Sequence, residues 1–193
     1  MRLRILDSGH SFRTKALFAV IRTVSRQPVP DVLKLVKYRP DFYGTPMSKL
    51  TQEAMRGPSA WLVAERELMA AFVAKANQCD FCTKTHAAVA QRAYGQVKNV
   101  SALMSNLDDA DLSEPLRATI HMLVKLTREH TVDAEDMRAV LASGASPQQI
   151  EEALAVCFSF NTMSRLADAF GFFVGGPEVF EAGAKFLLSR GYR

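Results

Sequence analysis

Cysteine is scarce in this chain of 193 residues, which has three, and it has a single tryptophan. Three cysteines are too few, and an odd number, for a secreted fold held by disulfides, so we expect a reducing cytoplasm. No apolar run approaches the roughly 18 residues that a membrane-spanning helix needs. The net charge is only +4, and its basic residues are spread along the chain. We therefore expect neither a nucleic acid nor a membrane as a partner.

Apolar residues recur at intervals of three and four along most of the chain, and this predicts an all-α fold. We expect helices over residues 31–38, 46–56, 59–76, 79–94, 113–129, 133–142, 147–170 and 178–189. Ser113 and Ser146, each followed closely by proline, are expected to cap two of them. Residues 1–27 would form an N-terminal leader with a helix over 12–24, which could tether subunits, and residues 28–193 the helical domain.

The most informative pattern lies between residues 67 and 86. Two residues separate Cys79 from Cys82, and His86 follows four residues after Cys82. In a helix that begins at Cys79, these side chains fall at i, i+3 and i+7 and share one face. Glu67 lies twelve residues before Cys79, on a preceding helix that ends near Asn77. The pattern predicts a dithiol, an imidazole and a carboxylate at one corner of the molecule.

These residue types suit thiol redox chemistry. The thiolate is the reactive form, and an ordinary cysteine has a pKa of about 8.5. The first turn of a helix stabilises a thiolate through its free N–H groups and its positive dipole end. His86 can accept a proton directly or through water, and Glu67 can orient the imidazole or act as terminal base. Cys79 and Cys82 are close enough in sequence to form a disulfide with little backbone movement.

The arrangement resembles the AhpD-like alkylhydroperoxidases of the carboxymuconolactone decarboxylase superfamily. The first matching stretch reads Glu67-Leu68, then Asn77-Gln-Cys79-Asp-Phe-Cys82-x-x-x-His86, Ala87 and Gly95. The second reads Asn161-x-x-x-Arg165-Leu-Ala-Asp168-Ala-x-Gly171 and is similar to the peroxidase-related members. The resemblance covers about residues 28 to 175. The four-residue Glu/Cys/Cys/His signature makes it specific, which a bare Cys-x-x-Cys would not be.

The resemblance implies an AhpD-like multi-helix bundle and a thiol-dependent peroxidase or disulfide reductase in antioxidant defence. Cys82 would attack the peroxide and become a sulfenic acid, and Cys79 would resolve it as a disulfide. His86 and Glu67 would relay protons. It also implies a small-molecule peroxide as substrate, a dithiol protein such as a lipoylated one as reductant, and a homo-oligomer, trimeric or hexameric. No organic cofactor or metal would be required, because the dithiol carries the electrons.

Several alternatives stay open from the sequence. Some AhpD proteins have an additional histidine where this chain has Phe81, so a slower peroxidase or a general disulfide reductase fits as well. The same disulfide could serve a non-enzymatic redox sensor. A decarboxylase or lyase could use only His86 and Glu67 as base and acid. Cys79, Cys82 and His86 could bind zinc if a fourth ligand joined them.

Overall fold

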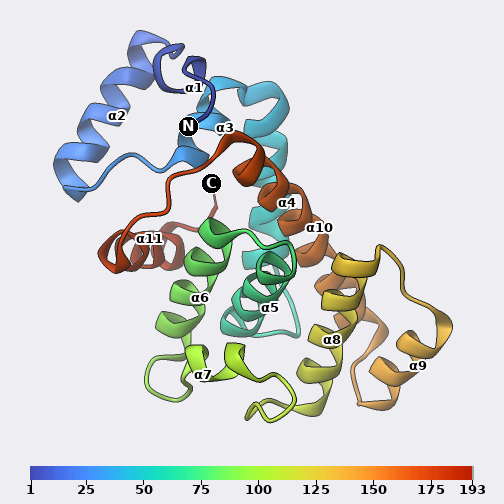
Figure 1. Ribbon diagram of the computed structural model, residues 1–193. Helices are drawn as coiled ribbons and strands as arrows, with labels where there is room; N and C mark the ends of the chain where they lie inside the picture. Colours follow the sequence, from blue (N-terminus) through green and yellow to red (C-terminus); the bar gives the residue numbers. More distant parts are fainter. Residues whose placement is uncertain (193) are drawn as a thin grey trace.

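The computed structural model describes residues 1–192, and all regular secondary structure in that range is helical (Figure 1). The elements in chain order are α1 (Ile5–Ser8), α2 (Phe12–Ser25), α3 (Asp31–Tyr38), the π-helical turn η1 (Pro40–Gly44), α4 (Thr45–Arg56), α5 (Val63–Ala76), α6 (Asp80–Tyr94), α7 (Val100–Ser105), α8 (Glu114–Glu129), α9 (Ala134–Ala142), α10 (Pro147–Phe170) and α11 (Pro177–Arg190). The predicted all-α fold is confirmed. The short elements α1, η1 and α7 were not predicted, since each has six residues or fewer and little periodicity to detect.

The start of α5 is the largest boundary error. The helix begins at Val63, whereas the sequence predicts residue 59. The intervening segment is bound to α10 instead, because the Ser59 hydroxyl donates to Glu152 Oε2 over 2.7 Å and the Trp61 indole donates to the Gln149 carbonyl over 2.8 Å. Tertiary hydrogen bonds therefore hold these residues in an extended linker that local propensity does not reveal.

The two predicted serine caps have different outcomes. Ser146 accepts from the Gln149 N–H over 3.1 Å, and Gln149 Oε1 accepts from the Ser146 N–H over 2.9 Å, which is a complete capping box. Ser113 occupies the cap position of α8 but makes no side-chain cap hydrogen bond. The predicted cap position is confirmed for both helices, and the cap hydrogen bond only for α10.

Helix α5 forms the centre of the core. It packs against α4, α6, α8 and α10, which surround it in Figure 1. Small residues such as Ala70, Ala71 and Ala74 allow close approach, and Leu68 and Met69 fill the space between helices. Because α5 and α6 are joined by a short turn, they run side by side, and the faces that carry Glu67 and the cysteine motif meet.

The N-terminal residues pack on the same domain. The Arg2 N–H donates to the Phe170 carbonyl over 2.7 Å, and Leu6 is 2% exposed in an apolar cluster with Leu35 of α3 and Phe172. Helix α2, by contrast, contains no buried residue. Within residues 1–192, none of the helices is both long enough and apolar enough to cross a membrane.

Candidate functional site

The turn between α5 and α6 places the first cysteine at a helix start. Gln78 has a left-handed backbone, with φ of 60°, which reverses the chain after α5. The Cys79 N–H donates to the Ala74 carbonyl over 3.0 Å and the Thr83 N–H donates to the Cys79 carbonyl over 2.9 Å. Cys79 is thereby the residue immediately before α6, and Cys82 is the third residue of that helix.

Cys79 and Cys82 are free thiols, and both are buried. Hydrogen bonds from the side chain and the backbone N–H of Cys82 outweigh burial and lower the pKa of the Cys79 thiol. The hydrogen bond to Cys79, together with burial, raises the pKa of the Cys82 thiol well above its ordinary value. The hydrogen-bonded pair therefore loses its first proton more readily than an isolated buried thiol, and it lies at the positive end of α6.

The surroundings of the two sulfurs are mostly apolar, although Asp168 and Ser164 of α10 also lie close to them, and the charge of Asp168 raises the pKa of both thiols. Leu6, Leu35 and Phe172 belong to the same buried cluster as the cysteines. The Phe81 ring, between the cysteines in sequence, packs edge-on against the Phe172 ring with 5.3 Å between centroids.

Glu67 and His86 form a second buried pair. Glu67 is 0% exposed, and its Oε2 lies 2.7 Å from His86 Nδ1. An ionised carboxylate only accepts hydrogen bonds, so a hydrogen bond of this pair to ionised Glu67 requires the hydrogen on Nδ1 and would leave Nε2 to exchange protons elsewhere. Glu67 is therefore not a solvated charge on a helix surface, the simpler interpretation of its sequence position.

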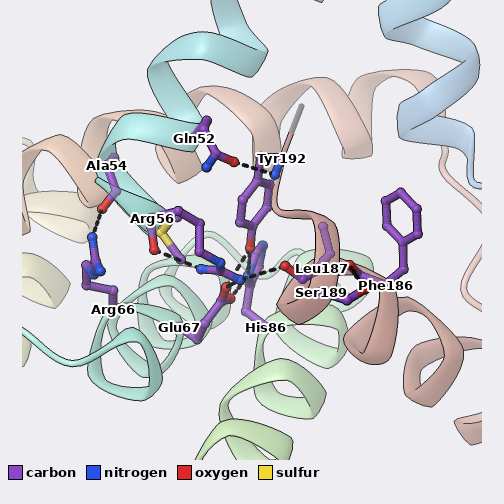
Figure 2. Close-up of polar contacts among 11 residues, drawn as sticks. Gln52, Ala54, Arg56, Arg66, Glu67, His86, Phe186, Leu187, Ser189 and Tyr192 are labelled. Atoms are coloured by element: carbon purple, nitrogen blue, oxygen red, sulfur yellow. Dashed lines mark hydrogen bonds and ion pairs between the residues drawn. The ribbon is translucent and has the colours of Figure 1, made fainter. Parts of the chain in front are cut away.

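Sequence reasoning missed two residues that contact Glu67. Arg56 Nη2 donates to Glu67 Oε1 over 2.6 Å, and the Tyr192 hydroxyl donates to the same oxygen over 2.8 Å. Figure 2 shows both groups meeting the carboxylate, with Tyr192 beside His86 and its hydroxyl 3.4 Å from His86 Nδ1. Arg56 comes from α4, and Tyr192 follows α11. A buried carboxylate needs a nearby cation, but the sequence does not show which arginine or lysine the fold brings to Glu67.

The four predicted residues come together as two pairs. The cysteines contact each other and Glu67 contacts His86, but among the described residues no hydrogen bond joins His86 to either thiol. A proton that passes between the pairs must therefore use water or a movement of the His86 ring. No continuous chain of hydrogen bonds therefore joins the four residues, and their joint action stays a prediction.

A polar network fixes the α5–α6 turn to α10. Asn77 Nδ2 donates to Asn161 Oδ1 over 3.1 Å, and Arg165 Nη1 donates to the same oxygen over 3.0 Å. Asn161 also donates to Thr127 Oγ1 over 3.2 Å. Asn161 and Arg165, two polar residues of the second matching stretch, thus pack helices together. The described residues contain no cluster of three or more His, Cys, Asp and Glu side chains arranged to hold a metal ion.

No protein-family model and no curated protein matches the chain. Solved structures do. An uncharacterized peroxidase-related protein from Silicibacter sp. TM1040 aligns with a TM-score of 0.73 and 22% identity, covering 89% of this chain and 88% of that one. An uncharacterized peroxidase-related protein with an alkylhydroperoxidase AhpD core, from Ralstonia eutropha JMP134, aligns with a TM-score of 0.73 and 19% identity, covering 91% and 92%.

The debrominase Bmp8 in its apo form also aligns, with a TM-score of 0.68 and 15% identity, covering 90% of this chain and 91% of that one. Identities this low establish the fold alone. The chain has the AhpD-like fold of the peroxidase-related proteins, as its sequence resemblance predicted. The debrominase indicates that proteins with this fold differ in activity, so the function must be argued from the site.

Proposed function

We propose that the protein is a thiol-dependent hydroperoxidase or disulfide reductase with Cys79, Cys82, His86 and Glu67 as its site. The observation that carries the proposal is the pair of free thiols in contact at the start of α6, where the pKa of Cys79 is lowered by Cys82. A dithiol in which one sulfur is readily ionised can be oxidised to a disulfide and reduced again.

In the proposed cycle, the Cys82 thiolate attacks one oxygen of a hydroperoxide, ROOH. A sulfur–oxygen bond forms, the oxygen–oxygen bond breaks, and the products are a Cys82 sulfenic acid and an alcohol, which takes up a proton. The Cys79 thiolate then attacks the sulfenic sulfur, which forms the disulfide and releases water after a second proton is added. A dithiol protein, lipoylated or of another kind, reduces the disulfide by exchange and is itself oxidised.

His86 would handle the protons, with Glu67 as its hydrogen-bonded partner. In the reduced pair, Cys82 holds its proton more tightly than Cys79, so an attack by Cys82 requires that proton to leave. His86 Nε2 can accept it through water and return it to the alcohol. The lowered pKa of Cys79 serves the second step, because the resolving sulfur must also attack as a thiolate.

The first test is peroxide consumption by reduced protein with a small dithiol as electron donor. We expect turnover to vanish in Cys82→Ser and in Cys79→Ser, and to fall by roughly 10²–10⁴ in Glu67→Gln, the scale of a lost acid–base group. Cys157→Ser is the matched control, since Cys157 is a buried thiol that hydrogen-bonds Thr127 and Asn161, away from the pair. Cys79→Ser should still form one sulfenic acid on Cys82.

The outcomes separate the alternatives. A sulfenic acid found on Cys79 in Cys82→Ser would reverse the roles of the two cysteines. Disulfide formation without turnover would indicate a redox sensor. Equal background rates in wild type and all variants would contradict the proposal.

A lyase-type reaction is the second candidate. It is favoured by the lack of a direct hydrogen bond from His86 to the thiols among residues 1–192, which leaves His86 and Glu67 as an independent acid–base pair. This reaction would survive the double change Cys79→Ser and Cys82→Ser and be lost in Glu67→Gln.

A further inference from the structure

Two groups outside the cysteine motif donate hydrogen bonds to the Glu67 carboxylate. Arg56 and Tyr192 both donate to Glu67 Oε1, at 2.6 and 2.8 Å, while His86 Nδ1 lies 2.7 Å from Oε2. The carboxylate is 0% exposed, so these protein groups replace the water that an ionised carboxylate would otherwise bind. One oxygen is committed to Arg56 and Tyr192, and the other is left for the imidazole.

We propose that Arg56 and Tyr192 are positioning residues for His86: they fix Glu67 as an ionised acceptor, which holds the imidazole in its Nδ1–H form. Glu67 therefore orients the imidazole and does not act as the terminal base. His86 Nε2 becomes the nitrogen that takes the thiol proton. The inference rests on the proposed function and deepens it, because it assigns a role to α4 and to the residue that follows α11.

Both positioning residues are themselves anchored. Arg56 Nη1 donates to the Met55 carbonyl over 2.8 Å and Nη2 donates to the Leu187 carbonyl of α11 over 3.2 Å. The Tyr192 N–H donates to Gln52 Oε1 of α4 over 2.8 Å, and the Arg56 guanidinium lies 5.0 Å from the centre of the Tyr192 ring. Figure 2 shows these contacts converging from α4 and from the end of α11. Because Arg56 and Tyr192 are held in place, rotation of the Glu67 carboxylate away from His86 would break its hydrogen bonds to both residues.

The charges around Glu67 favour its ionised form. Burial opposes ionisation, but the hydrogen bond and charge of His86 and the charge of Arg56 outweigh it and hold the pKa of Glu67 below its ordinary value. Burial and the Glu67 charge raise the pKa of Tyr192 well above its ordinary value, so the phenol stays a donor. On α5 itself, Arg66 is turned to the Ala54 and Gly57 carbonyls, at 3.2 and 3.0 Å.

Helix α10 contributes an apolar neighbour to the imidazole. The Phe160 and His86 ring centroids are 4.1 Å apart, and the rings meet edge-on with an angle of 65° between their planes. This contact restricts the ring without offering it a proton acceptor. The orientation of His86 therefore depends on Glu67, through Glu67 on Arg56, and on Tyr192 both through Glu67 and directly, because the Tyr192 hydroxyl lies 3.4 Å from His86 Nδ1.

The experiment compares wild type with Tyr192→Phe, Arg56→Met and Arg56→Lys. Tyr94→Phe is the matched control, because the Tyr94 hydroxyl is buried and has no hydrogen-bond partner. The readouts are the ¹⁵N NMR tautomer of His86, the infrared band of a protonated Glu67 carboxyl as pH is lowered, and the pH profile of kcat. The first two need no turnover.

We expect the Nδ1–H tautomer in wild type. In Arg56→Met the protonated carboxyl should appear at a pH higher by about one unit or more, with the acid limb of kcat moving equally. Arg56→Lys keeps the positive charge, so its Glu67 carboxyl should titrate close to that of wild type. Tyr192→Phe should lower kcat by roughly 10-fold with little change in KM, the size of one lost hydrogen bond to a charged group. Tyr94→Phe should match wild type.

An Nε2–H tautomer in wild type would overturn the inference. So would a Tyr192→Phe protein that matches Tyr94→Phe in both the NMR and the infrared titration, even if Arg56→Met does not fold. Absence of peroxide turnover in wild type would instead contradict the proposed function, and the NMR and infrared results would still decide the role of Arg56 and Tyr192.

Discussion

Helices α2 and α5 each have 14 residues, and both are rich in apolar side chains, yet they have opposite environments. Ten residues of α5 are buried, including the charged Glu67 and Arg66, while α2 has none. On α2, Phe12 is 86% exposed and Val24 is 79% exposed. Figure 1 shows α5 enclosed by other helices and α2 at the edge of the molecule.

The difference teaches that neighbours, more than composition, decide the role of a helix. α5 is surrounded on all sides, so even its carboxylate is buried and must be paired, which creates a site. α2 presents an apolar face flanked by Arg13, Lys15 and Arg22, and that face is uncovered in the single chain. The expectation that the leader tethers subunits of a homo-oligomer stays a prediction.

The largest effect should come from the centre of α5. Leu68 is 0% exposed, so Leu68→Ala should lower the free energy of unfolding by about 2–5 kcal/mol, because apolar burial is lost and a cavity remains. Leu62→Ala is the matched control, since Leu62 precedes the same helix and is 65% exposed. Urea denaturation of both variants measures the difference, and equal losses would show that α5 is not the centre of the core.

A smaller effect should come from the charge inside α5. Glu67→Gln should cost about 1–3 kcal/mol at neutral pH, because Arg56 loses its charged partner. The pKa of Glu67 is lowered in the folded protein, so its contribution is fully present above the ordinary carboxyl pKa and is lost as pH falls through the folded-state value. The stabilities of wild type and Glu67→Gln should therefore converge in acid.

Thermal melts of both proteins from neutral to acid pH would test this. A constant gap across the whole range would mean that the ionisation of Glu67 does not contribute to stability. A gap that widens in acid would contradict the direction of the pKa shift.

The smallest effect should come from α2. Val24→Ser should change the free energy of unfolding of the isolated chain by no more than about 0.5 kcal/mol, because the side chain is already in water. Leu6→Ala, in the neighbouring α1, should cost about 2 kcal/mol or more, because Leu6 is 2% exposed beside the cysteines. Urea denaturation measures both.

Sedimentation of the same α2 variant tests the tethering prediction. If α2 covers a second copy of the chain, Val24→Ser should weaken self-association and leave the folded subunit intact. A wild-type protein that sediments as a monomer would contradict the tether.

Local sequence was sufficient for most elements of the fold. The period of three and four predicts the long helices, and the proline and glycine positions place most of their ends within two residues, as at α3 and α6. It failed where tertiary contacts override local preference, as in the linker before α5, where Ser59 and Trp61 bind α10. It also missed the short α7, which is too short to show a periodic pattern.

The sequence by itself also determined the chemistry of the motif: Cys82 and His86 lie one turn apart on α6 because of their spacing, and Glu67 lies on the helix beside them. Cys79 is the residue before α6 and has an extended backbone, so the predicted helix face does not include it. Only the tertiary structure decided that the four form two pairs, and that Arg56 and Tyr192 complete the second. Tyr192 is 125 residues from Glu67, and no local pattern records such a contact. The physical reason is that spacing along a helix fixes which residues of that helix are neighbours. The partner of a buried charge depends instead on which other helix ends pack beside it.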